Sequence, residues 1–488
     1  MTGVTGFALV ILVAAAVILA AILSNRLTDR LRVPAPAVFL VGAALVATFV
    51  PGLAQALPVQ TVSWVVTVAL VMILFDGGMS IGWERFRSAT GPILWVGVLG
   101  TAATAGAVAG LAHLVFGLPW LPALVLGTAL SPTDPAVVFS VLGHREVTGR
   151  SGTLLEGEAG VNDPVGIALM VSLIAGVGTG VVSPAPVFTK FLVQMVVGAA
   201  VGGCGGWLLL QTMRRLPLPT EGLYPLRALA GALFLYGAAT LADGSGFLAV
   251  FVAGIVIGDA WVPYKRDVEQ FHSALASLSE IVAFLLLGLT IPLRTLPANN
   301  AWVMGLVLAA LLAFLVRPVL VGLLLVPIRL RWGERVFVMW SGLKGAVPIL
   351  LGVFALLGAV PDAVRIYDAI FVVVAVSVIL QGSLVPLVAN RAGVPMRVVD
   401  LTPWTLGLRF RHRPEGVQRF QVAPGSPANG SRVAELGVGR DVWISFVVRQ
   451  GRLVQVRGDT QLQAGDEVLA LVDPQCTVDL DAIFEGSA

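Results

Sequence analysis

Residues 131–138 read SPTDPAVV and interrupt a stretch that is otherwise apolar from about Leu118 to Val141. Each proline removes a backbone hydrogen bond from a helix, and a carboxylate in the middle of a membrane helix is energetically expensive. Membrane proteins tolerate such a break mainly where the backbone lines a cavity. The stretch therefore predicts a broken membrane helix that places Asp134 at a functional cavity.

The composition of the whole chain indicates an all-α polytopic membrane protein. Of its 488 residues, 57% are hydrophobic and only 12% are charged, and the mean hydropathy is +0.91. A soluble core cannot absorb that much apolar sequence. The formal net charge of +3 is too small to indicate a nucleic-acid partner. The cysteines and histidines show no disulfide or zinc spacing, so we expect no cofactor.

Hydropathy over windows of about 19 residues predicts about thirteen transmembrane helices, the first of which we interpret as a span and not as a removed signal peptide. Loops rich in arginine and lysine alternate with loops that hold few basic residues. The positive-inside rule then puts the N-terminus outside the plasma (inner) membrane and the C-terminal region in the cytoplasm. The predicted spans are 4–24, 34–52, 60–79, 91–114, 118–142, 151–176, 187–211, 225–242, 245–260, 275–293, 301–327, 335–360 and 365–390.

The composition changes after Arg391, where charged and polar residues become more frequent. Runs in which apolar residues alternate with polar ones begin at Trp443 and Glu467, and Gly465 marks a turn between such runs. We therefore expect a membrane domain over residues 4–391, a linker over 392–415 and a small cytosolic α+β domain over 416–488.

Four of the predicted spans bring ionisable side chains to about the middle of the bilayer. These are Asp134, Asp163, Arg317 and Lys344, and Glu158 lies somewhat nearer the cytosol. Charged residues at this depth are expensive, so each is a candidate functional residue.

Asp163 follows Asn162 in the stretch GEAGVNDPVGIAL. Glu158 and Asn162 are four residues apart and share a helix face, whereas Asp163 is turned about 100° away from Asn162. We interpret Asp163 as a buried carboxylate that binds either a cation or a proton. The alternative is a structural carboxylate paired with Arg317 or Lys344.

Thr133 and Asp134 lie between Pro132 and Pro135. Carbonyl groups freed by the two prolines can coordinate a dehydrated monovalent cation, which is the functional interpretation of this break. The alternative is a kinked helix that Asp134 merely caps.

A second break mirrors the first, as an inverted repeat requires. Residues 340–352 read WSGLKGAVPILLG and place Lys344 among glycines. Spans one to six and eight to thirteen would form the repeats, with two crossing broken helices and the seventh span as connector. Lys344 would neutralise the helix dipoles that face it, unless it snorkels to the interface.

Arg317 cannot easily reach the interface from the middle of its span, so we expect it to pair with Glu158 and to steady Asn162 as a scaffold residue. Asp76 and Asp259 lie near predicted cytoplasmic span ends. They either line a funnel to the site or are ordinary interface residues.

The motifs SPTDPAVVFSVLG, GEAGVNDPVGIAL, the segment around Arg317 and SGLKGAVPI resemble, in order and spacing, the monovalent cation:proton antiporters of the sodium/proton exchanger superfamily. The resemblance covers about residues 5–390 and is to the electroneutral NhaP-like branch. The tail resembles a TrkA-C (RCK C-terminal) regulatory domain. That pairing and the Asn-Asp-Pro sequence favour the potassium/proton antiporter subgroup.

The resemblance implies a homodimer in the lipid membrane and alternating access, with the cation held by Asp163, Asp134, the Thr133 backbone and Glu158. Two positions depart from the family pattern. Ala159 stands where many members have serine, which removes a hydroxyl ligand and suits a larger ion, and Lys344 stands where many have arginine.

We therefore expect exchange of K⁺, or alternatively Na⁺, for H⁺ in cation and pH homeostasis. Asn162 holds no titratable proton, so one Asp163 would exchange one cation for one proton. A ligand-gated cation channel would need a filter of carbonyls or a charged ring, and a non-transporting sensor would not need buried charges. No nucleophile–base arrangement indicates an enzyme. The tail either binds a nucleotide or other small effector, or supports dimer contacts.

Overall fold

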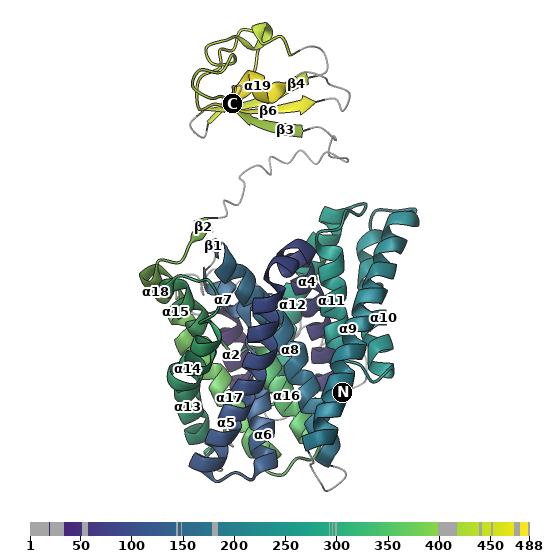
Figure 1. Cartoon of the computed structure of the whole chain (residues 1–488), viewed down its shortest axis with the longest axis vertical. Helices are drawn as coiled ribbons and strands as arrows, with labels where there is room; N and C mark the ends of the chain where they lie inside the picture. Colours follow the sequence, from purple (N-terminus) through teal and green to yellow (C-terminus); the bar gives the residue numbers. More distant parts are fainter. Residues whose placement is uncertain are drawn as a thin grey trace. The chain divides into compact units, whose positions relative to one another are not determined.

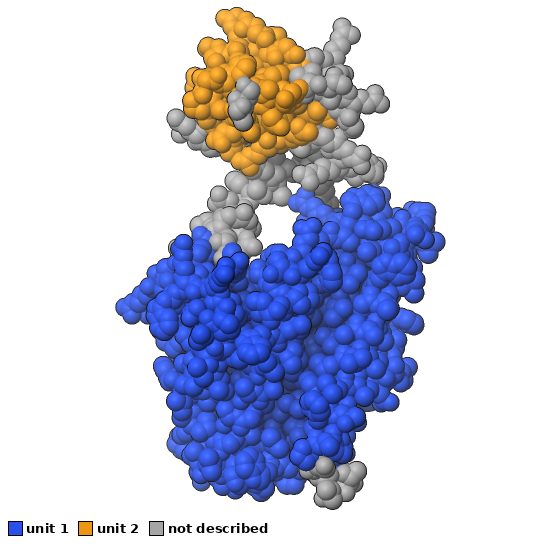
Figure 2. Space-filling view, viewed as in Figure 1, with its two compact units in different colours: residues 1–399 blue, residues 400–488 orange. Residues whose placement is uncertain are grey.

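The chain forms two compact units, residues 1–399 and residues 400–488 (Figure 2). The predicted span 4–24 lies outside the described residues, apart from Leu19. The computed structural model describes Leu19 and residues 34–50, 57–142, 145–147, 149–177, 184–291, 293–294, 296–297, 300–398, 417–438, 442–449, 452–472 and 479–486.

The first unit is a bundle of helices, and every predicted span from 34–52 onward coincides with a helix or a pair of helices (Figure 1). Six helices of the described chain are long and apolar enough to cross a membrane. The helices are α2 (Ala35–Phe49), α4 (Val59–Leu94), α5 (Thr101–Phe116), α6 (Trp120–Ala129), α7 (Pro135–Leu142), α8 (Arg150–Val177), α9 (Pro184–Arg215), α10 (Leu223–Leu241), α11 (Gly246–Gly258), α12 (Lys265–Leu289), α13 (Ala301–Leu311), α14 (Arg317–Leu324), α15 (Trp332–Trp340), α16 (Ala346–Leu357), α17 (Ala363–Val376) and α18 (Gly382–Ala392).

Helical residues join the predicted spans 60–79 and 91–114. The two spans therefore form one kinked helical stretch from Val59 to Phe116. At the kink Gly82 has a φ of +67°, and a Cβ there would lie 2.2 Å from Oδ1 of Asp259. The backbone N–H of Glu84 donates to Oδ2 of Asp259 at 2.6 Å. Asp259 therefore caps the helix segment that restarts after the kink, a role that neither interpretation of its sequence position included.

In the described part of the chain, three long helices contain π-helical turns, which the sequence pattern did not predict. They are η1 (Trp95–Gly100), η2 (Leu312–Val316) and η3 (Ser377–Gln381). Such turns are rare and are often found at functional sites. Here η2 and η3 both line the same cavity beside the second helix break, described below.

Helix α12 begins at Lys265, ten residues before the predicted start at 275. Its first turns hold Lys265, Arg266, Asp267 and Glu269, which lower the hydropathy and conceal the helix start. The earlier start changes the depth of Glu280. With a rise of 1.5 Å per residue, Glu280 lies about 22 Å from the first residue of the helix.

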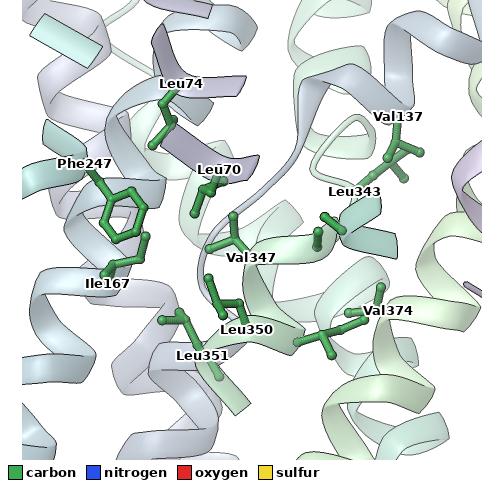
Figure 3. Packing of buried hydrophobic residues seen from close by; sticks show 14 of the residues in the cluster. Leu70, Leu74, Val137, Ile167, Phe247, Leu343, Val347, Leu350, Leu351 and Val374 are labelled. Carbon is green, nitrogen blue, oxygen red and sulfur yellow. The ribbon is translucent and has the colours of Figure 1, made fainter. Parts of the chain in front are cut away.

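Close approach of small residues holds the helices together. A Cβ on Gly254 of α11 would lie 2.5 Å from the carbonyl oxygen of Phe75 in α4, which is the kind of backbone contact that drives helix association in membranes. Around the second broken helix, Val347, Leu350 and Leu351 of α16 pack among side chains of α4, α8 and α17 (Figure 3). This packing surrounds α16 with protein on several sides.

The second unit is a four-stranded antiparallel sheet with the order β3-β6-β4-β5. The runs predicted at Trp443 and Glu467 form its two central strands. Arg449 donates two hydrogen bonds to the buried Asp466, at 2.8 and 2.7 Å, and this carboxylate raises the pKa of Arg449. The elements are β3 (Val417–Gln421), β4 (Val442–Arg449), β5 (Arg452–Val454), β6 (Glu467–Val472) and the helix α19 (Leu480–Phe484), whose Phe484 stacks on Phe420.

A short ladder joins two loops of the first unit. Strand β1 (Arg145–Val147) follows α7, and strand β2 (Met396–Val398) follows α18. The two pair antiparallel, with Arg145 opposite Val398 and Val147 opposite Met396 (Figure 1). The segment that leaves the membrane bundle toward the tail is therefore hydrogen bonded to the connection between α7 and α8.

Candidate functional site

The two broken helices meet at their breaks. The first break is the non-helical segment between Ala129 of α6 and Pro135 of α7, and the second separates Trp340 of α15 from Ala346 of α16. The backbone N–H of Asp134 donates to the carbonyl oxygen of Leu343 at 2.8 Å. Each break thus satisfies a backbone group of the other, as buried backbone in a membrane requires.

Gly345 allows this close approach. A Cβ at that position would lie 1.9 Å from Oδ2 of Asp134 and 2.5 Å from its Cβ. Even alanine would therefore overlap the carboxylate, so the glycine is needed for the contact between the breaks.

Asp134 uses its two carboxylate oxygens differently. Oδ1 accepts from the backbone N–H of Ala136 at 2.9 Å and so caps α7. Oδ2 lies beside Gly345. The capping interpretation therefore accounts for one oxygen and leaves the other for an ion site.

Asn162 connects the first break to α8. Its Nδ2 donates to Oγ1 of Thr133 at 2.7 Å, and both residues are buried. Its Oδ1 is also buried and has no hydrogen-bond partner among the described residues. A buried amide oxygen without a partner is costly, and a bound cation would satisfy it.

Glu158 and Arg317 form a buried ion pair, with 2.9 Å between Oε1 and the guanidinium. Arg317 also donates to the carbonyl oxygens of Val338 and Met339, at 3.2 and 3.0 Å. The arginine thus ties α8 to the end of α15, and its pairing with Glu158 is the one that the sequence suggested. Within the described chain, Oε2 of Glu158 has no hydrogen-bond partner.

Lys344 crosses from the second break to the first. Its ammonium donates to the carbonyl oxygens of Ser131 and Pro132, at 3.2 and 2.9 Å, and its backbone N–H donates to Oγ of Ser377 at 3.1 Å. These carbonyls follow the C-terminus of α6, where a positive charge is favourable. The side chain is buried and does not snorkel to the interface.

Asp163 lies within electrostatic range of both Asp134 and Lys344. It is 9% exposed and makes no hydrogen bond to a described residue, unlike Asp134 and Glu158. Its carboxylate is therefore the least engaged of the three. The structure gathers all the predicted site residues around the crossing of the breaks: Thr133, Asp134, Glu158, Asn162, Asp163, Arg317 and Lys344.

The oxygen atoms around the crossing suit a hard monovalent cation, for which carboxylate and carbonyl ligands are appropriate. Asp134 and Asp163 supply carboxylates, and Asn162 supplies the amide oxygen that has no partner. Among the described residues there is no group of three or more histidines, cysteines and carboxylates placed to hold a metal ion.

Glu280 of α12 is a site residue that the sequence analysis missed. Its carboxylate lies near enough to Asp134 for the two to interact electrostatically. Its Oε1 is buried and lacks a hydrogen-bond partner in the described part of the chain. The signal was a single acidic residue within an apolar run, hidden because the predicted span began too late.

A cavity of about 650 Å³ adjoins the second break. Its wall is mainly apolar and comes from η2, η3 and neighbouring turns, while Arg317 and Lys344 reach it from the site. The cavity therefore leaves free space beside the positively charged side chains of Arg317 and Lys344.

Two protein families match the chain. The profile of the family described as "Sodium/hydrogen exchanger, transmembrane" matches residues 13–391, and that of the TrkA-C domain matches residues 417–482.

Named antiporters are similar to the chain over 68% to 98% of its length. The K(+)/H(+) antiporter NhaP of Alkalimonas amylolytica is 32% identical over 98% of this chain and 84% of its own length. The K(+)/H(+) antiporter NhaP2 of Shewanella sp. (strain MR-4) is 31% identical over 95% of this chain and 81% of its own. The Na(+)/H(+) antiporter NhaH of Halobacillus aidingensis is 26% identical over 68% of this chain and 83% of its own.

A solved structure shares the fold. The sodium proton antiporter MjNhaP1 from Methanocaldococcus jannaschii at pH 8 superposes with a TM-score of 0.67 and 21% identity, covering 79% of this chain and 99% of that one. At this identity the likeness supports the helical architecture and not the ion.

Proposed function

The chain belongs to the sodium/hydrogen exchanger family and is a monovalent cation:proton antiporter, and we propose that it exchanges K⁺ for H⁺ at Asp163. The family is one of transporters rather than enzymes. The long matches to relatives named K(+)/H(+) antiporters support K⁺, as does the presence of a TrkA-C domain. The observation that carries the site is Asp163, a buried carboxylate without a hydrogen bond to a described residue and within electrostatic range of Asp134 and Lys344.

Asp163 holds either the cation or the proton, which makes the two mutually exclusive and so couples their movements. Thr133, Asp134 and Asn162 complete the cation ligands, with Glu158 held beside them by Arg317. Asn162 donates to Thr133 and has no proton to exchange. One Asp163 then exchanges one cation for one proton, and transport is electroneutral.

We also propose the number of transmembrane helices, the domain bounds, the oligomeric state and the orientation in the membrane. Thirteen transmembrane helices form two inverted repeats over residues 4–391, residues 392–415 are the linker, and residues 416–488 are the regulatory domain. The protein is a homodimer in the plasma (inner) membrane, with its N-terminus outside and its tail in the cytoplasm. The tail binds a small-molecule or nucleotide effector, and the transporter serves cation and pH homeostasis.

Proton flux tests the proposal in inside-out vesicles from a host without its own antiporters. Addition of K⁺ or Na⁺ to acidified vesicles should restore acridine-orange fluorescence for wild type, and Asp163→Asn should abolish the response. Asp267→Asn, which changes an exposed carboxylate of α12, is the control and should transport normally. Transport that survives in Asp163→Asn contradicts the assigned role.

The half-maximal concentrations distinguish K⁺ from Na⁺, which is the alternative that the Halobacillus relative favours. A net current in proteoliposomes would overturn the electroneutral stoichiometry. A protein that is present in the membrane yet responds to neither ion, with or without residues after about 400, would contradict the proposed exchange.

A further inference from the structure

A second cavity, with a volume of about 1040 Å³, lies away from the crossing of the breaks. Three arginines from distant parts of the chain line it: Arg85 of α4, Arg150 at the start of α8 and Arg329 between α14 and α15. We refer to it as the arginine cavity. All three arginines belong to the basic loops that the positive-inside rule assigns to the cytoplasmic side.

The described residues that line the arginine cavity carry an excess of positive charge. Arg85 approaches Glu156 at 3.6 Å, and both line the cavity. Within the described part of the chain, neither Arg150 nor Arg329 has a carboxylate within 4 Å, the distance that defines an ion pair. The described lining therefore carries three positive charges against one negative charge, and it suits an anion.

One side of the lining is apolar, with Pro92, Trp95 and Ile328 among its residues. Trp95 lines the cavity, is 44% exposed and donates from Nε1 to the carbonyl oxygen of Leu324 at 3.2 Å. Three exposed apolar side chains lie within two positions of Trp95 or Leu324 in the sequence: Leu94, Leu323 and Val326. Tryptophan is enriched at the level of the headgroups, where its ring meets apolar chains and its N–H meets polar groups.

We propose that the arginine cavity binds the headgroup phosphate of an anionic phospholipid. Arg150 and Arg329 contact the phosphate, and the acyl chains lie along the exposed surface of Leu94, Trp95, Leu323 and Val326. Basic cavities between membrane helices on the cytoplasmic side are suited to such headgroups. The apolar side of the cavity favours a lipid over free phosphate, because a soluble anion would leave that surface unused.

The position of the cavity gives the lipid a structural effect. Gly149 and Arg150 line the cavity at the N-terminus of α8, the helix that carries Glu158, Asn162 and Asp163. An anion at a helix N-terminus is favourable. A bound lipid would therefore stabilise the membrane unit by holding α4, α8 and the α14–α15 connection together, whichever cation the protein transports.

Thermal unfolding and native mass spectrometry of the purified full chain test the proposal. The probes are palmitoyl-oleoyl phosphatidylglycerol, the matching phosphatidylcholine and inorganic phosphate. We expect phosphatidylglycerol alone to raise the unfolding temperature and to remain bound in the mass spectrometer. Each arginine near a membrane anion contributes about fivefold in affinity, so Arg150→Gln and Arg329→Gln should each weaken binding by about that factor.

Two further variants keep the test specific. Arg215→Gln removes an exposed arginine at the end of α9, outside the cavity, and should bind the lipid like wild type. Arg329→Lys keeps the charge and should retain most of the binding, which separates loss of charge from misfolding. Equal stabilisation by phosphatidylcholine, full stabilisation by inorganic phosphate, or an equal loss in Arg215→Gln would each overturn the proposal. Because binding is measured directly, its failure is distinct from a failure of K⁺ exchange.

Discussion

The two helix breaks differ in how they are made and in what they carry. The first is made by two prolines and carries the carboxylate of Asp134, whereas the second is made by glycines and carries the ammonium of Lys344. Asp134 caps its own helix, but Lys344 donates to carbonyls of the opposite break. The first break therefore leaves one carboxylate oxygen for the proposed ion site, while the second supplies the space beside Gly345 and the positive charge of Lys344.

Gly345→Ala tests the space that the second break provides, and it should have the largest effect. The added methyl would lie 1.9 Å from Oδ2 of Asp134 and 2.5 Å from its Cβ, so the Asp134 side chain would have to move. Overpacking of this kind costs about 1–3 kcal/mol or more. We expect cation-driven proton flux to fall to background. Gly106→Ala, where nothing lies within 4 Å of the new Cβ, is the control and should behave like wild type.

Asp134→Asn separates capping from ion binding at the first break. The amide oxygen can still accept from Ala136, so the unfolding temperature should stay within about 2 °C of wild type. Loss of a charged ligand is worth about 1.5–3 kcal/mol, so exchange should fall at least about tenfold. Asp134→Ala should lose both activity and stability. If the asparagine variant transports normally, Asp134 is only a cap.

Lys344→Met and Lys344→Arg test the fixed charge. Methionine removes both hydrogen bonds to the carbonyls of the first break, and we expect at least about a tenfold loss of exchange. Arginine keeps the charge at the site, so its rate should stay within about threefold of wild type. Initial rates of proton flux at matched expression provide the measurement. Equal rates for both variants would show that the positive charge of Lys344 is not needed beside the carbonyl groups of the first break.

Glu280→Gln tests whether a second carboxylate acts on Asp134 of the first break, and it should have the smallest effect. Two neighbouring buried carboxylates repel each other unless a cation or a proton lies between them. Removing one should change the half-maximal K⁺ concentration by about threefold with little change in maximal rate. Glu269→Gln, on the same helix but half exposed and paired with Lys265 at 3.5 Å, is the matched control. An unchanged K⁺ dependence would place Glu280 outside the ion pathway.

Sequence reasoning located the breaks because prolines, glycines and isolated charges are conspicuous in apolar helices. It suggested the Arg317–Glu158 pair for the same reason, since a buried charge needs a partner. Glu280 was missed because charged residues in the first turns of α12 moved the apparent helix start to 275. The π-helical turns left no signal in the apolar pattern, because they depend on how neighbouring helices pack.

The contact between Gly345 and Asp134 also could not be predicted. It requires the three-dimensional crossing of segments that are about two hundred residues apart, and the sequence indicates only that each segment is irregular. The same applies to the arginine cavity, where three basic loops that look alike in the sequence contribute to one space. Spacing along a helix identifies which residues are buried, but it does not identify which helices meet.

The ladder between β1 and β2 determines how mechanical load reaches the membrane unit. Because β2 is hydrogen bonded to β1, a force applied at β2 acts on the α7–α8 connection as well as on α18. That connection lies between the helix capped by Asp134 and the helix that carries Asp163. The three residue pairs of this ladder therefore attach β2 to the connection between the two helices that bear the ion-site carboxylates.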